Sequence, residues 1–187
     1  MWKDFIINGK TITESGFTIK FPQSSIFFID FDRLKSSFSS FYRINNTPSS
    51  SDFVCLGLVQ SRCCCYIIEA KNFDKIQNLA NKNTLNKLEM SLSKKLVDTL
   101  LILAGIIEGR EKKLLFQTLW DEEIVYYLLV REKEIESIIK VIEYLERRIT
   151  KNLKSCGYKK IRVYFITLDN LQKRLNNLEE LEDYNYE

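Results

Sequence analysis

Alternation between apolar β-rich runs and long amphipathic helical patterns constrains the fold of this sequence most. Apolar runs at residues 63–70, 124–130 and 160–166 are separated by helical patterns at 85–106 and 135–153, in which leucine and isoleucine recur every three or four positions. Neighbouring strands joined by a helix lie parallel in a sheet, because the helix returns the chain to the edge where it started. The alternation therefore predicts an α/β fold with parallel strands.

An antiparallel pair precedes the parallel strands. The runs FVCLGLV (53–59) and CCCYIIEA (63–70) are separated only by Gln60-Ser61-Arg62, which predicts a β-hairpin. Before them, residues 31–42 carry aromatic and leucine side chains at helical spacing and predict a helix. We expect a mixed β-sheet flanked by helices on both faces, followed by a short last helix within residues 168–181.

The N-terminal region predicts a small β-hairpin addition. In FIINGKTI, Asn8-Gly9 separates two short apolar runs, and this dipeptide favours a type I′ turn, in which both central residues have positive φ. FTIKFP then alternates as a strand does, up to Pro22. Residues 45–52 predict a loop, and residues 111–119 fit a helix or a strand.

The length of 187 residues suits one domain rather than two. We divide it into an N-terminal hairpin extension (1–25), a core (26–130), an additional helix-strand-helix segment (131–178) and an acidic tail (179–187). No apolar run reaches the roughly 18 residues of a membrane helix, and the first residues lack the apolar segment of a signal peptide. We expect an intracellular, cytoplasmic protein that does not act in a membrane.

Cysteine and histidine content excludes several kinds of site. The chain has five cysteines, no CxxC motif and no histidine, so we expect no zinc site and no disulfide framework. The cysteines are interpreted as small buried residues in a reducing compartment. Without histidine, Ser-His-Asp and Cys-His catalysis are excluded. An enzyme with this sequence has to use carboxylates, lysine, tyrosine or a thiol.

Charge is unevenly distributed along the chain. The tail EELEDYNYE (179–187) holds five acidic and no basic side chains. The preceding residues carry 28 basic against 20 acidic side chains, a net charge of +8. Such a body with an acidic tail fits a polyanion-binding protein, and it also fits plain solubility.

Three charged residues meet at one end of the predicted hairpin. Glu69 and Lys71 end the strand CCCYIIEA and point to the same face, because strand residues alternate. Asp52 starts the partner strand. A register that pairs Asp52 with Glu69 or with Lys71 puts all three on one face, whereas pairing with Ala70 turns Asp52 away. The sequence leaves this choice open, so the charges form either an exposed strand end or part of a metal site.

The spacing of Asp52 from Glu69-Ala70-Lys71, at the end of an apolar strand, resembles the PD-(D/E)XK nuclease superfamily. The family core, a restriction-endonuclease-like arrangement of helix, three antiparallel strands, helix and parallel strand, would correspond to roughly residues 26–130. Ser51 stands where the family has a proline. The layout is also similar to resolvase-like members and to small nuclease-like proteins of archaeal viruses and mobile elements.

The resemblance implies metal-dependent hydrolysis of DNA. It implies that Mg²⁺, or Mn²⁺, is held by the carboxylates of Asp52 and Glu69 and the carbonyl of Ala70, ligands that such hard cations prefer. The bound cation would activate a water molecule, and Lys71 would orient that water or stabilise the transition state. It also implies branched or structured duplex DNA as substrate, a homodimer, and the host cytoplasm as location if the protein is viral.

Further residues have two readings each. Asp32 or Asp30 would complete the acidic site, or they act as helix caps. Lys94 or Lys95 is a candidate phosphate contact, or part of a solvated helix face. Four aromatic residues are interpreted as core rather than as base-stacking platforms: Phe27, Phe28, Tyr126 and Tyr127.

Two other functions remain open beside the nuclease. The same fold can serve as a non-catalytic nucleic-acid- or protein-binding module that keeps the charges for structure. A helical interaction protein built on residues 133–155 is a third reading. Loss of cleavage with intact folding in a Glu69 variant separates the first two readings, and helix and strand content separates the third.

Overall fold

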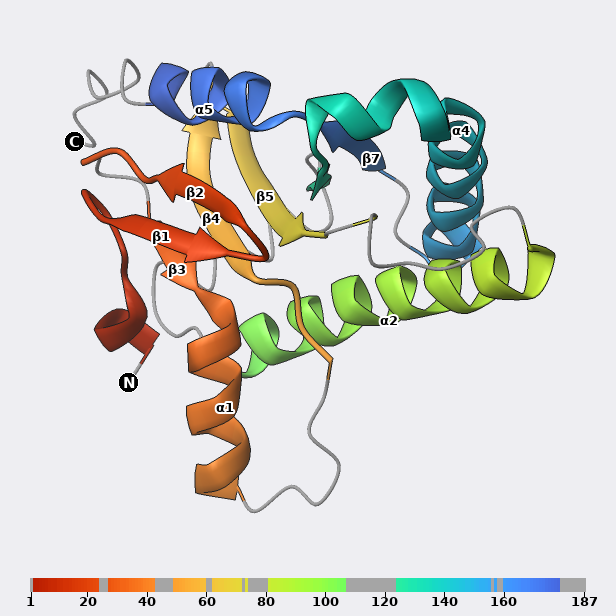
Figure 1. Ribbon diagram of the computed structural model, residues 1–187. Helices are drawn as coiled ribbons and strands as arrows, with labels where there is room; N and C mark the ends of the chain where they lie inside the picture. Colours follow the sequence, from red (N-terminus) through yellow and green to blue (C-terminus); the bar gives the residue numbers. More distant parts are fainter. Residues whose placement is uncertain are drawn as a thin grey trace.

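A five-stranded mixed sheet forms the centre of the molecule (Figure 1). The computed structural model describes residues 2–23, 27–42, 49–59, 62–71, 73, 81–106, 124–155, 157 and 160–178. In spatial order the strands are β3 (Phe27–Asp30), β4 (Phe53–Val59), β5 (Arg62–Ala70), β6 (Ile124–Leu129) and β7 (Ile161–Ile166). The pairs β3-β4 and β4-β5 are antiparallel, whereas β5-β6 and β6-β7 are parallel. The predicted mixed α/β sheet is confirmed.

Helices and a small hairpin cover the two faces of the sheet. The helices are α1 (Phe31–Tyr42), α2 (Lys82–Ile106), α4 (Glu132–Ser155) and α5 (Leu168–Asn177), with a short 3-10 helix, η1 (Trp2–Phe5), at the N-terminus. Helices α2 and α4 pack against each other below one face, and α5 lies over the other (Figure 1). The hairpin of β1 (Thr11–Glu14) and β2 (Phe17–Lys20) shares that second face with α5. Each predicted helix is present.

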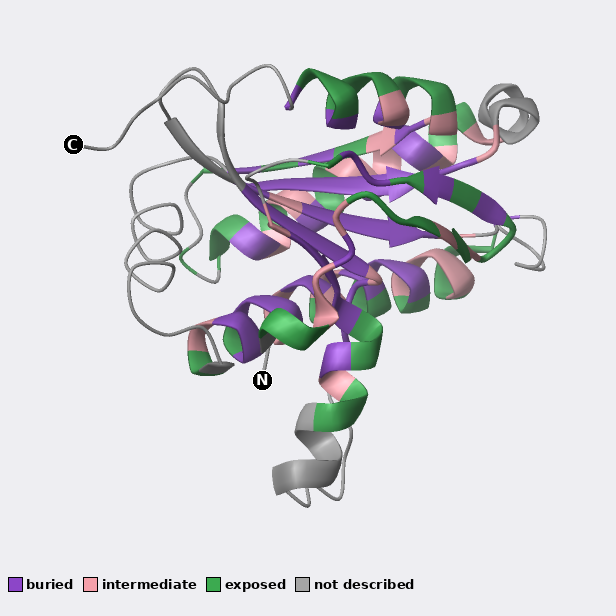
Figure 2. Cartoon of the chain, turned by 90° about the vertical axis from the view of Figure 1, so that its left-hand side faces the viewer, coloured by how far each residue is buried: buried purple, intermediate pink, exposed green. Residues whose placement is uncertain are grey.

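Alternating side chains of each strand enter two separate apolar cores. On β5, Cys65 and Ile67 belong to the core beneath α2 and α4, whereas Ile68 and Ala70 belong to the core beneath the hairpin and α5. Because both faces are covered, every residue of β6 is buried, as the purple strands in Figure 2 show. A strand buried on both sides has an unbroken apolar sequence, as the runs here have.

One strand was not predicted, and it changes the order of the elements. Phe27–Asp30 pairs antiparallel with β4 and runs directly into α1. The nuclease core implied by the resemblance has its first helix before all three antiparallel strands, whereas here α1 lies between the first and the second. The strand has only four residues, too few for a clear alternation in the sequence.

The predicted turn of the N-terminal hairpin is wrong by several residues. The hairpin turns at Ser15-Gly16, where both residues have positive φ (51° and 82°). Gly9 also has positive φ (69°), but the side chain of Asn8 accepts a hydrogen bond from the backbone nitrogen of Phe28 at 3.0 Å. Asn8 therefore fastens the N-terminal segment to β3 instead of closing a hairpin.

Some sequence predictions fall outside the described residues. These are residues 45–48 of the predicted loop 45–52, the ambiguous segment 111–119 and the acidic tail. Of the five cysteines, Cys55 and Cys65 are described with their side chains, and both are buried as expected. Tyr126, Tyr127 and Phe28 are buried core residues, as interpreted from the sequence. Among the described helices, none has both the length and the apolar character needed to cross a membrane.

Candidate functional site

The register of the β4-β5 hairpin brings Asp52 beside Glu69. Phe53 pairs with Ile68, and continuing this register by one residue places Asp52 opposite Glu69. This is one of the two registers that put the charges on one face. Glu69 is two residues after Ile67 on β5, so both side chains point to the face covered by α2 and α4. The candidate site therefore lies under these helices at the end of β5.

Asp52 joins three elements of the structure. Its carbonyl oxygen accepts hydrogen bonds from the backbone nitrogens of Phe31 (2.9 Å) and Asp32 (3.4 Å), in the first turn of α1. Its carboxylate Oδ2 accepts a hydrogen bond from the backbone nitrogen of Ala70 at 2.6 Å. The start of β4, the start of α1 and the end of β5 are thus held together at one residue, which fixes the carboxylate at the strand end.

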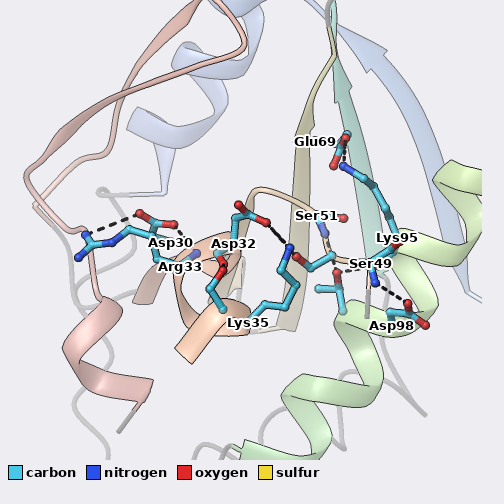
Figure 3. A network of polar contacts seen from close by, with 12 residues as sticks. Asp30, Asp32, Arg33, Lys35, Ser49, Ser51, Glu69, Lys95 and Asp98 are labelled. Atoms are coloured by element: carbon cyan, nitrogen blue, oxygen red, sulfur yellow. Dashed lines mark hydrogen bonds and ion pairs between the residues drawn. The ribbon is translucent and has the colours of Figure 1, made fainter. Parts of the chain in front are cut away.

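Helix α2 fixes the segment that leads into Asp52. The carboxylate of Asp98 accepts a hydrogen bond from the backbone nitrogen of Ser49 at 2.8 Å, and the Thr99 hydroxyl accepts one from Ser51 at 2.9 Å. The Thr99 hydroxyl also lies 2.7 Å from the carbonyl oxygen of Lys95, to which it donates. Figure 3 shows this segment against α2, with Lys95 extending toward the sheet. Two backbone donors that the sheet leaves unpaired are satisfied in this way.

Glu69 is almost fully buried and is ion-paired to Lys95. Its exposed fraction is 1%, and the Nζ atom of Lys95 lies 2.5 Å from its Oε1 (Figure 3). Lys71 is half-buried, and its backbone nitrogen donates to the carbonyl of Leu129. Lys71 lowers the pKa of Glu69, but the charge of Lys95 and its hydrogen bond each lower it more. The main cation beside Glu69 is thus Lys95 of α2 and not Lys71 of the sequence Glu69-Ala70-Lys71.

Burial and neighbouring charge disfavour the ionised form of Asp52. Burial and then the charge of Glu69 raise the pKa of Asp52 from 3.8 to about 8. Burial also raises the pKa of Glu69, against the opposing effect of Lys95. For Lys95, burial lowers the pKa, but the charges of Glu69, Asp52 and Asp32 outweigh it, so its pKa is raised. Such shifts cluster at functional sites, where burial and charge are concentrated.

Buried oxygen atoms beside the carboxylates lack partners. In the described part of the chain, Glu69 Oε2, Ser51 Oγ and the hydroxyl of Tyr126 are buried and make no hydrogen bond. Burial raises the pKa of Tyr126 well above 10, and Glu69 and Asp52 add to the shift, so its hydroxyl lies near both. The Ser51 hydroxyl lowers the pKa of Tyr126, although the hydroxyls of Ser51 and Tyr126 form no hydrogen bond with each other. Buried oxygens without a partner are costly, and a bound ion or water is one way to satisfy them.

Of the two accessory aspartates, Asp32 lies toward the site and Asp30 caps α1. Asp30 Oδ1 accepts a hydrogen bond from the backbone nitrogen of Arg33 at 3.2 Å, the contact of an N-cap. Asp32 contacts Lys35 at 2.6 Å and the hydroxyl of Ser50 at 3.4 Å. Its charge also acts on Glu69 and Lys95. Figure 3 shows Asp32 between the Asp30–Arg33 pair and the Glu69–Lys95 pair.

The two adjacent lysines of α2 have different surroundings. The side chain of Lys94 is 60% exposed and pairs with Asp98 one turn along the helix. It fits the solvated-face interpretation. The side chain of Lys95 is 25% exposed and points to Glu69. The solvated-face interpretation does not fit Lys95.

Sequence reasoning missed Thr99 and Asp98, and it did not connect Glu14 to the site. The charge of Glu14, at the end of β1, adds to the raised pKa of Asp52 and of Asp30. Nothing in the sequence connects Glu14 to them, because the hairpin belongs to a separate sheet. Thr99 stands in the apolar stripe of α2 and is 0% exposed. A buried threonine in such a stripe needs a hydrogen-bond partner, and this signal was available in the sequence.

The donor set fits a hard divalent cation. Two carboxylates at a strand end, a backbone carbonyl at Ala70 and the unpartnered Glu69 Oε2 are oxygen ligands of the kind Mg²⁺ takes, together with several waters. Within the described ranges, no group of three or more His, Cys, Asp or Glu is placed to hold a metal. Comparisons with protein-family models, with curated proteins and with solved structures found no match.

Proposed function

We propose that the protein is a Mg²⁺-dependent endonuclease that hydrolyses phosphodiester bonds in DNA. The observation that carries the proposal is the meeting of Asp52 and Glu69 on one face of the sheet, where Glu69 is buried, Asp52 is half-buried and burial raises the pKa of both. Keeping two carboxylates together in a buried place is unfavourable unless a cation joins them. A structural role alone does not require that arrangement.

Asp52, Glu69 and the carbonyl of Ala70 would hold the cation. When bound, Mg²⁺ lowers the pKa of a coordinated water and neutralises charge that develops on the phosphate. The chain itself supplies the positioning. Hydrogen bonds from the Ala70 nitrogen to the Asp52 carboxylate, and from the backbone nitrogens of Phe31 and Asp32 in α1 to the Asp52 carbonyl, keep the carboxylate at the strand end before any ligand arrives. A pre-organised site needs little rearrangement during the reaction.

Charge around the site supports a polyanionic substrate. The residues before the tail carry a net charge of +8. Lys71 and Lys35 lie at the same end of the sheet as the carboxylates and are half-buried. Positive side chains beside a metal-binding carboxylate pair attract phosphate groups and counter their repulsion by the acidic site. We propose branched or structured duplex DNA as substrate and a homodimer as the active form.

The test is cleavage of a panel of DNA substrates with and without Mg²⁺. Linear duplex, single-stranded DNA and a four-way junction are incubated with wild-type protein, with Glu69→Gln and with Lys94→Gln as a control on the same helix as Lys95. We expect nicking that needs Mg²⁺ or Mn²⁺ and that falls by about 100-fold or more in Glu69→Gln. Lys94→Gln should cleave like the wild type.

Binding of the same DNA, measured by fluorescence anisotropy, separates the enzyme from a binding module. Retained binding by Glu69→Gln together with lost cleavage supports the enzyme. Binding without nicking by the wild type on every substrate, with either cation, contradicts the proposed activity. That result leaves the non-catalytic nucleic-acid-binding module as the function of the fold.

A further inference from the structure

We propose that Lys95 of α2, and not Lys71 of the strand motif, is the lysine that contacts the reacting phosphodiester group. The inference rests on the proposed nuclease function and assigns the catalytic cation of that site. The sequence motif points to Lys71, because it follows Glu69 by two positions on the same face. The contacts in the structure favour Lys95 instead.

Lys95 lies among the carboxylates of the site. Its Nζ atom is 2.5 Å from Glu69 Oε1, and the charges of Glu69, Asp52 and Asp32 all act on it. If Glu69 held the cation, Lys95 would stand beside the phosphate that the cation binds and could donate to it. Lys71 lowers the pKa of Glu69 less than Lys95 does. Its charge is not among the main influences on Asp52.

The position of Lys95 is fixed by its helix. Leu92 and Leu96 beside it are buried at 1% and 0% exposure, so this face of α2 is packed on the sheet. The carbonyl of Lys95 accepts a hydrogen bond from Thr99, whose hydroxyl also holds Ser51. A side chain on a packed helix is placed more accurately than one in a loop. Lys71 follows the last residue of β5.

Lys95 acts as a donor and not as a base. The ammonium of lysine has three donors and no acceptor, and here it donates to Glu69 Oε1. In the reaction, the oxygen of a water molecule bonds to phosphorus and the bond from phosphorus to the leaving ester oxygen breaks. The water proton goes to solvent, and the leaving oxygen takes a proton from solvent. Lys95 stays protonated and donates to a non-bridging oxygen, whose negative charge grows in the transition state.

The test compares Lys95→Gln, Lys71→Gln and Lys94→Gln in steady-state cleavage with Mg²⁺. Glutamine removes the charge and still donates a hydrogen bond to Glu69. We expect Lys95→Gln to lower kcat by about 100-fold with little change in KM, as removal of one transition-state donor does. Lys71→Gln should mainly raise KM, by no more than about tenfold. Lys94→Gln should resemble the wild type.

A second measurement does not depend on turnover. Removing the ammonium beside Glu69 and Asp52 should tighten Mn²⁺ binding to Lys95→Gln by about threefold or more, measured by titration calorimetry, whereas Lys94→Gln should bind Mn²⁺ like the wild type. If Lys95→Gln proves too unstable, Lys95→Arg keeps the charge and should fold, with a kcat lowered through the changed donor geometry.

Two outcomes overturn the assignment, and they differ from failure of the nuclease proposal. Near-normal kcat in Lys95→Gln, or a larger loss of kcat in Lys71→Gln, shows that Lys95 is not the catalytic lysine. The proposed nuclease activity is unaffected by that outcome. Absence of cleavage by the wild type removes the enzyme and this role of Lys95 together. Circular-dichroism spectra of each variant exclude unfolding as the cause.

Discussion

The buried ion pair between Glu69 and Lys95 gives the most direct test of the site as the structure describes it. Lys95→Met removes the ammonium while keeping a side chain of similar length. Glu69, with 1% of its surface exposed, is then left as a buried carboxylate without its cation. Glu69→Gln and the double variant complete a double-mutant cycle.

The expected loss follows from the burial of the pair. Removing one partner of a buried ion pair costs about 3–5 kcal/mol, because the remaining charge is uncompensated. A domain of this size is stable by about 5–15 kcal/mol, so roughly a fifth or more of its stability would be lost. The melting temperature should fall by about 10 °C, at roughly 2–4 °C per kcal/mol. The double variant has no unpaired charge and should recover at least about 2 kcal/mol.

The loss should depend on pH in a defined direction. Burial already raises the pKa of Glu69 in the folded protein, and without Lys95 nothing comparable opposes that effect. A carboxyl with a raised folded pKa keeps a proton that the unfolded chain releases, so stability falls as the pH rises above its ordinary value of 4.5. The cost of Lys95→Met should therefore be largest at alkaline pH and shrink toward pH 5.

Urea unfolding followed by circular dichroism, in EDTA and between pH 5 and 9, measures these free energies. Lys94→Met serves as the matched control, because its side chain is 60% exposed. Exposed pairs contribute little, so this variant should change stability by less than about 1 kcal/mol. A loss below about 1 kcal/mol in Lys95→Met at pH 8, or a loss that grows toward acid pH, would refute the reasoning.

Two further predictions concern Asp52 and Thr99. Asp52→Asn should be more stable than the wild type at pH 8 in EDTA. The pKa of Asp52 is raised from 3.8 to about 8, so the wild type loses stability between these pH values and the asparagine variant does not; equal pH slopes in thermal melts would contradict this. Thr99→Val leaves the buried nitrogen of Ser51 without an acceptor and should cost about 1–3 kcal/mol in urea unfolding. Thr99→Ser keeps the hydroxyl and should cost less; equal losses would show that the hydrogen bond contributes little.

Most elements of this fold follow from local sequence patterns. Helix α4 was predicted from an apolar stripe that includes Leu145, Ile149 and Leu153, all of which are buried. Strands β4 to β7 were predicted from apolar runs, because a strand covered on both faces has no polar side to interrupt it. Strand β3 and the turn at Ser15-Gly16 were not predicted. Both are short, and Asn8-Gly9 carried a stronger local signal that the structure uses for a different contact.

The residues of the candidate site were predicted in part. The pattern of Asp52, Glu69 and Lys71 named the strand residues, because alternation and hairpin pairing are local rules. The sequence did not determine the register of the β4-β5 hairpin. It follows from the fit of both strand faces to two cores at once, since a shift by one residue would exchange every side chain between them.

The sequence by itself determined the alternation of helices and strands, the absence of histidine chemistry and the identity of the carboxylates. Only the tertiary structure decided that Glu69 is paired with Lys95 and that Thr99 and Asp98 hold the segment before Asp52. These contacts join segments far apart in the chain, and each depends on how α2 packs against the sheet. Local sequence carries no information about that packing, because many residues distributed over both cores determine it together.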